Sequence, residues 1–112
     1  MAAYVELYID QGTTFSNIIN ITDDTTNTPV NIQGYIVSSQ MRRSYYSANA
    51  AANITCTITD ALEGEITMSM TAANTSNIKA GRYLFDVETI DTLGTVSRIL
   101  EGIITITPQI TR

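Results

Sequence analysis

The sequence has no histidine and no tryptophan, and it has one cysteine, Cys56. Histidine is the commonest general base and the commonest transition-metal ligand, so its absence excludes Ser-His-Asp and Cys-His catalytic arrangements. A single thiol can form neither an intrachain disulfide nor a thiolate zinc cage. Because Cys56 stands in an alternating stretch, it is predicted to be a small buried apolar residue rather than a reactive thiol.

Positive charge is also scarce, since 6 Lys and Arg residues face 11 Asp and Glu residues and the net charge is −5. Binding of a polyanion needs clustered basic residues, and here only Arg42 and Arg43 are adjacent. The composition therefore predicts no nucleic-acid partner. No segment approaches the roughly 20 apolar residues of a membrane span, and Met1–Val5 lacks the basic start and apolar run of a signal peptide. We therefore expect no membrane partner and synthesis in a cytoplasm without export by a cleaved signal.

The glycines stand apart from one another, outside any phosphate-binding motif, and are predicted to lie in turns or bulges. Carboxylates are the catalytic material that remains. Asp23 and Asp24, and the group of Asp60, Glu63 and Glu65, fall in predicted turns, where acidic residues are common for conformational reasons. A calcium site is the alternative, although no EF-hand spacing accompanies either group. The sequence thus predicts no metal, no cofactor and no enzymatic activity.

What the sequence does contain is a persistent alternation of apolar and polar residues with a period of two, which is typical of β-strands. The clearest example is the run Ile54–Thr59, where Ile and Cys alternate with Thr. A chain of 112 residues with 44% hydrophobic composition is long enough for one domain with its own core. Strands are predicted over 5–10, 15–22, 35–41, 54–59, 66–70, 81–90 and 96–107.

Turn-forming residues separate these strands, with a long loop over 42–53, one helical turn within 71–80 and a hairpin turn at 91–94. This spacing predicts a single all-β domain, an antiparallel two-sheet β-sandwich of about seven strands. The likeness to immunoglobulins is architectural, because their Cys, Trp and Cys set is missing. Gly81 is expected to open its strand in a backbone conformation that penalises a Cβ atom. The predicted core includes Ile54, Cys56, Ile58, Ile66, Met68, Tyr83, Phe85 and Val87.

The segment 42–46 is the most interesting exposed candidate, because Arg42 and Arg43 precede Tyr45 and Tyr46. Arg and Tyr are favoured at the energetic centres of protein interfaces, so all four are candidate interface residues. Two alternatives remain open. One Tyr could cap the core while an Arg pairs with a carboxylate, or the cluster could bind a glycan or a phosphate.

The last two strands carry charges that need an explanation. Asp86 and Glu88 share a strand face, and Arg98 lies across the hairpin turn at a distance that lets it oppose one of them. The result is either a salt-bridged solvent face or a subunit contact, in which Arg98 and Glu101 are candidate interface residues. Either an edge strand or the loop 42–46 is expected to lie in the contact between copies. The strand 96–107 is the candidate edge strand for pairing with a neighbouring chain, since it has no internal Pro or Lys.

Several short motifs follow one another along nearly the whole chain. In order they are Ile9-Asp10-Gln11-Gly12, Val30-Asn31-Ile32-Gln33-Gly34-Tyr35, Gly64-Glu65-Ile66, Ala80-Gly81-Arg82-Tyr83, Phe85-Asp86-Val87-Glu88 and Glu101-Gly102. In this order and spacing, the chain resembles a family of small virion structural proteins of tailed bacteriophages and prophages, including cyanobacterial viruses. The resemblance implies an immunoglobulin-like or related β-sandwich in the phage neck, tail or baseplate, in many copies and with no catalytic residue.

Two functions are therefore considered. The first is a virion structural subunit that assembles with itself, as a homo-oligomer, or with other virion proteins. The second is a carbohydrate-binding or adhesive β-sandwich module that contacts a host surface. Sugar binding usually needs exposed flat rings, and here only Tyr and two Phe are available, so the first function is favoured.

Overall fold

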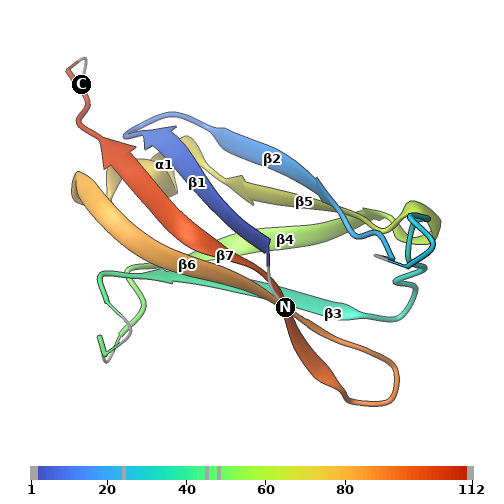
Figure 1. Ribbon diagram of the computed structural model, residues 1–112. Helices are drawn as coiled ribbons and strands as arrows, with labels where there is room; N and C mark the ends of the chain where they lie inside the picture. The colour runs from blue at the N-terminus through green and yellow to red at the C-terminus, as the bar shows by residue number, and fades with distance from the viewer. Residues whose placement is uncertain (1–2, 24, 45, 48, 111–112) are drawn as a thin grey trace.

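The computed structural model describes residues 3–23, 25–44, 46–47 and 49–110. This part of the chain contains seven strands, with a 3-10 turn η1 and one short helix α1 (Figure 1). The elements are β1 (Ala3–Asp10), β2 (Phe15–Asn20), β3 (Ile36–Arg42), β4 (Ala52–Asp60), η1 (Ala61–Glu63), β5 (Glu65–Met70), α1 (Ala72–Ser76), β6 (Gly81–Ile90) and β7 (Val96–Thr107).

The seven strands form one hydrogen-bonded sheet in the order β1-β7-β6-β3-β4-β5-β2. Every pair in this sheet is antiparallel except β1 with β7, which is parallel. The sheet curls on itself into a shape close to a barrel, with β1 and β2 at its two ends (Figure 1). The all-β class and the number of strands are confirmed. The arrangement in two separate sheets is not confirmed, because the hydrogen bonding runs on through β3, β4 and β5.

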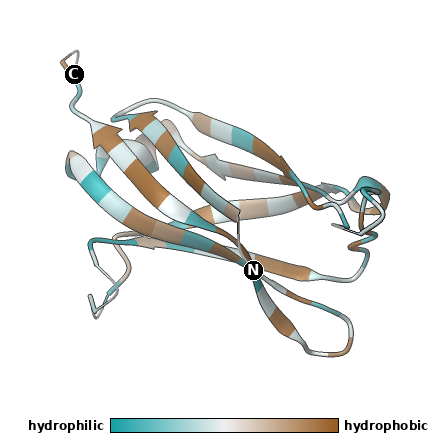
Figure 2. Ribbon diagram, viewed as in Figure 1, coloured by the Kyte–Doolittle hydropathy of each residue, from teal (hydrophilic) through white to brown (hydrophobic). Residues whose placement is uncertain are grey.

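Strand positions follow the period-two pattern closely. β6 and β7 have the predicted bounds, and Figure 2 shows hydrophobic and hydrophilic bands alternating along them. The predicted helical turn is α1, which begins after Thr71, whose side-chain oxygen accepts a hydrogen bond from the backbone N–H of Asn74. This is the usual N-cap arrangement, and it satisfies one of the N–H groups that a helix start leaves without a partner.

The core lies inside the curled sheet. Six of the eight predicted core residues are buried there, and the other two, Cys56 and Ile58, are half-buried. Each fully buried aliphatic side chain contributes about 1.5–3 kcal/mol relative to its exposed state. The buried apolar residues are Ile9, Ile32, Met41, Ile54, Ile66, Met68, Met70, Ile78, Tyr83, Phe85, Val87, Leu100, Ile104 and Ile106.

A buried hydroxyl holds one end of the curled sheet together. Thr75 of α1 is fully buried, and its Oγ1 accepts a hydrogen bond from the Gly12 N–H (3.1 Å) and donates one to the Thr13 carbonyl oxygen (2.7 Å). Gln11 donates from Nε2 to the Ile78 carbonyl oxygen at 2.8 Å. The turn between β1 and β2 is thereby attached to the helix, and the buried polar groups are satisfied.

The position of β7 corrects one expectation. From Leu100 onward β7 lies between β1 and β6, so the prediction that it is an edge strand is wrong over most of its length. Only the segment 96–99 extends beyond the start of β1, because Ala3 pairs with Leu100. β1, which pairs in parallel with β7, is separated from it by nearly the whole chain. Local sequence patterns carry no information on a pairing between such distant segments, so the sequence could not predict it.

The contact between β1 and β7 depends on Gly102. A Cβ atom at this position would collide with the Val5 carbonyl oxygen, so the two backbones approach more closely than any side chain permits. Gly102→Ala should therefore displace β1 and destabilise the fold by about 2 kcal/mol or more, which corresponds to a fall of roughly 10 °C in the melting temperature. Thermal unfolding followed by circular dichroism measures this change.

Gly94→Ala is the matched control, because a Cβ atom there would have nothing within 4 Å and only the positive φ of +85° opposes it. We expect this variant to lose about 1 kcal/mol. Equal losses for the two alanine variants would contradict the proposed steric role of Gly102.

Gly81 also has the backbone conformation that the sequence predicted, with a φ of +144°. A Cβ atom there would also lie 2.8 Å from Nη1 of Arg43, the mobile end of a long side chain. Gly81→Val should destabilise by about 1–3 kcal/mol, mainly through the backbone. The alternative cause is the collision with Arg43. If that collision were responsible, Gly81→Val would cost little stability in a protein that also carries Arg43→Ala.

Candidate functional site

The outer face of β1, β7, β6 and β3 is hollowed into a groove of about 560 Å³. Three of the six predicted interface residues line it: Arg42, Arg98 and Glu101. The strand register explains why they meet. Asp86 of β6 pairs with Glu101, and Glu88 pairs with Arg98, so these residues occupy neighbouring rows of one face. The remaining lining residues are Tyr4, Gln40, Ser44, Leu84, Phe85, Asp86, Glu88, Gly102 and Ile103.

Arg98 is the central charge of the groove. Its Nε lies 3.2 Å from Asp86 Oδ2, and its Nη1 lies 3.4 Å from Glu101 Oε2. The expected pairing of Arg98 with an acidic residue of the preceding strand is confirmed for Asp86. The ion pair is formed with Asp86 and not with Glu88, although Glu88 lies opposite Arg98 in the register. Both ion pairs are solvent-accessible and contribute at most about 1 kcal/mol each, so they mainly orient the guanidinium.

Arg42 stands at the other wall of the groove. It donates from Nη1 to the Ser47 carbonyl oxygen (2.9 Å) and from Nη2 to Gln40 Oε1 (3.0 Å). The first bond fixes the loop that follows β3, which agrees with a structural role for the cluster. The second holds the Gln40 amide in the groove wall. Arg42 therefore fixes the loop and also lines the groove.

Arg43 lies away from the groove. Its guanidinium carbon is 4.7 Å from the centre of the Tyr83 ring, a cation–π contact, and the Tyr83 hydroxyl donates to the Lys79 carbonyl oxygen at 2.6 Å. Such a contact is worth about 0.5–1 kcal/mol at an accessible site. Tyr46 is 95% exposed, and Tyr45 lies outside the described residues. Within this segment, Arg42 thus lines the groove, Arg43 contacts the Tyr83 ring and Tyr46 is exposed to solvent.

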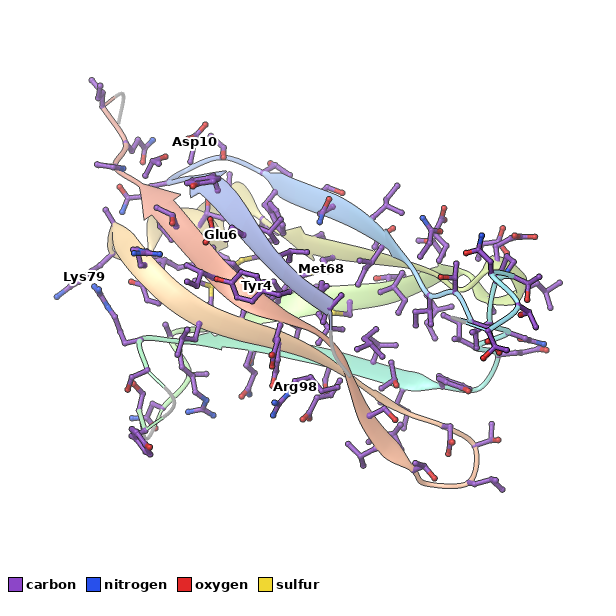
Figure 3. All side chains as sticks on the ribbon, in the orientation of Figure 1. Tyr4, Glu6, Asp10, Met68, Lys79 and Arg98 are labelled. Atoms are coloured by element: carbon purple, nitrogen blue, oxygen red, sulfur yellow. The ribbon has the colours of Figure 1, made fainter. Side chains whose placement is uncertain are left out.

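Sequence reasoning missed Tyr4, which projects from the opposite wall of the groove and is labelled with Arg98 in Figure 3. Its hydroxyl donates to Glu6 Oε1 at 3.4 Å, and its side chain remains 59% exposed. Alternation with Val5 already indicated an outward side chain. The sequence did not show which strand pairs with β1. Tyr4 lies opposite Glu101 because β1 pairs in parallel with β7.

The groove combines charged, polar and apolar side chains. Carboxylates, guanidiniums and an amide surround a floor made by Leu84 and Ile103, both half-buried. Burial raises the pKa of the Cys56 thiol to about 11, so this group stays protonated near neutral pH. Among the described residues, no group of three or more His, Cys, Asp or Glu side chains could hold a metal ion. No helix in that part of the chain is long and apolar enough to cross a membrane.

No protein-family model matches the chain, and no curated protein matches it in sequence. Among solved structures, it is similar to a variant of the SrpA adhesin from Streptococcus sanguinis, with 12% identity, 97% of this chain covered and a TM-score of 0.53. It is also similar to CopC from Methylosinus trichosporium OB3b, with 12% identity, 68% coverage and a TM-score of 0.42. The chain spans 56% of the adhesin chain and 66% of the CopC chain. At this identity, the likeness to the adhesin concerns the fold alone.

Proposed function

We propose that the chain is a non-enzymatic structural subunit of a tailed-phage virion, in the neck, tail or baseplate, and that it acts through protein–protein assembly. The observation that carries the proposal is the groove, which gathers Tyr4, Arg42 and Arg98 on one sheet face. Tyr and Arg are enriched where interfaces concentrate their binding energy. The assignment to a virion rests on the sequence resemblance, and the partners are copies of this chain or other virion proteins.

The groove is suited to this role because strands and not loops carry most of its walls. Arg98 is held by Asp86 and Glu101, and Arg42 is held by Gln40 and Ser47. A side chain that is already fixed loses less conformational entropy when a partner binds. We also propose that the halves β1-β7-β6-β3 and β4-β5-β2 correspond to the two layers of an immunoglobulin-like sandwich, joined here through β3 and β4.

Arg98→Glu should weaken assembly by about tenfold, because it places a third carboxylate beside Asp86 and Glu101. The fold should persist, since the ion pairs that are lost are solvent-accessible. Light scattering at micromolar concentration measures self-assembly, and pull-down with purified virion proteins measures docking onto other partners.

Arg82→Glu is the matched control, because Arg82 is an exposed residue of β6 that does not line the groove. A folded Arg98→Glu variant that assembles and docks like the unmodified protein would contradict the proposed role of the groove. A protein that remains a 12.2 kDa monomer and binds no virion protein would contradict the assembly function itself.

The second candidate is an adhesive or carbohydrate-binding module, and the feature that favours it is the exposed Tyr4 ring beside polar groups that could bind sugar hydroxyls. The similar fold of the SrpA adhesin is compatible with it. If this candidate is correct, immobilised glycans should retain the unmodified protein. They should not retain Tyr4→Ala, because the aromatic ring that stacks on the sugar is lost. Equal retention of both forms, or of neither, would remove the candidate.

A further inference from the structure

Large apolar side chains are exposed next to the groove, at the end of the same face. Ile36 of β3 pairs with Ile90 of β6, and Ile90 pairs with Val96 of β7, so the three form a row across the sheet. Ile36 is 63% exposed and Val96 is 58% exposed. At the tip of the β6–β7 hairpin, Leu93 is 91% exposed. An apolar patch of this kind on a folded chain commonly marks an interaction site. We call these four residues the hairpin patch.

The hairpin projects from the body of the molecule, as Figure 1 shows. Its tip is nevertheless well ordered by hydrogen bonds. Asp91 Oδ1 accepts from the backbone N–H groups of Leu93 and Thr95, each at 2.9 Å, and the Asp91 N–H donates to the Thr95 carbonyl oxygen at 3.0 Å. Leu93 is therefore presented by a preorganised turn, which lowers the entropy cost of docking.

We propose that the hairpin patch of one copy docks into the groove of a second copy. The inference rests on the proposed assembly function and names its partner. The groove offers an apolar floor, Leu84 and Ile103, that matches the apolar patch. Because patch and groove share one face, two copies that face each other with their strands reversed place each hairpin over the other's groove. Such a contact is reciprocal and closes as a twofold dimer.

The distribution of charge supports a second copy as the occupant. The groove carries three carboxylates, Asp86, Glu88 and Glu101, and two guanidiniums, Arg42 and Arg98, so a strongly acidic partner segment would be repelled. The hairpin from Ile90 to Ser97 has one charged side chain, Asp91, and its Oδ1 is bound by two backbone N–H groups of the turn. The exposed residues Leu93 and Val96 are uncharged, so they bring no further charge to the groove.

The test measures the oligomeric state of three proteins by light scattering over a micromolar concentration range. The unmodified protein should be a dimer of twice 12.2 kDa. Leu93→Asp should weaken dimerisation by at least about tenfold, because the added carboxylate would have to be buried on the apolar floor beside the carboxylates of the groove. Leu62→Asp, at an exposed position of η1, should dimerise like the unmodified protein.

Cross-linking then tests the geometry. A mixture of Leu93→Cys and Gln40→Cys proteins should form a cross-linked dimer, whereas neither variant alone should do so. Cys56 adds little background, because its half-buried thiol has a pKa raised to about 11. A link formed by Leu93→Cys alone would indicate contact between two tips and would overturn the proposed geometry.

The other outcomes separate the two proposals. If the protein dimerises and Leu93→Asp has no effect, the inference fails while the assembly function stands, with the sheet edges β1 and β2 as alternative contact surfaces. If the unmodified protein is a monomer at all concentrations, the inference also fails. The assembly function is then decided by the pull-down with virion proteins.

Discussion

The close approach of two backbones at Gly102 is the constraint on which much of this structure depends. A side chain at Gly102 would occupy the position of the Val5 carbonyl group, so the glycine lets β1 add in parallel to β7. That pairing turns the last strand of the chain from an edge into an interior strand. It leaves β1 and β2 as the ends of the curled sheet and brings Tyr4 beside the groove. At Gly102 a glycine is required because a side chain would collide with the neighbouring backbone, whereas at Gly81 the positive φ favours glycine.

The groove illustrates how weak interactions can determine geometry. The ion pairs of Arg98 are solvent-accessible and add little to the free energy of folding. They nevertheless hold one guanidinium between two strands, with a carboxylate on each side. The β-bulge after Val87 places Arg98 and Glu101, which are three residues apart on β7, opposite Glu88 and Asp86, which are two residues apart on β6, so all four lie on one face. A local irregularity of the backbone thus defines the arrangement of charge on the face that we propose as the contact surface.

The free edges raise a separate physical question, since unpaired strand edges invite association with other chains. β1 presents the charged residues Glu6 and Asp10, both exposed, and two such edges would repel each other. β2 has only six residues and is followed by an isolated antiparallel bridge between Thr22 and Pro29. The buried hydroxyl of Thr75 fastens the turn between these strands to α1 and keeps the edges in place. These features make the sheet face, rather than its edges, the better candidate for a specific contact.

The sequence by itself determined the all-β class, the bounds of β6 and β7, six of the eight predicted core positions as buried and the conformation of Gly81. These properties are local, because side chains alternate every two residues and turn residues act within a few positions. Only the tertiary structure decided that the sheet is continuous, that β7 is interior, that Arg98 binds Asp86 and that Arg43 stacks on Tyr83. Each of these features depends on which strands or loops meet in space. The pattern of one segment cannot specify its neighbour, since many registers and partners satisfy the same alternation.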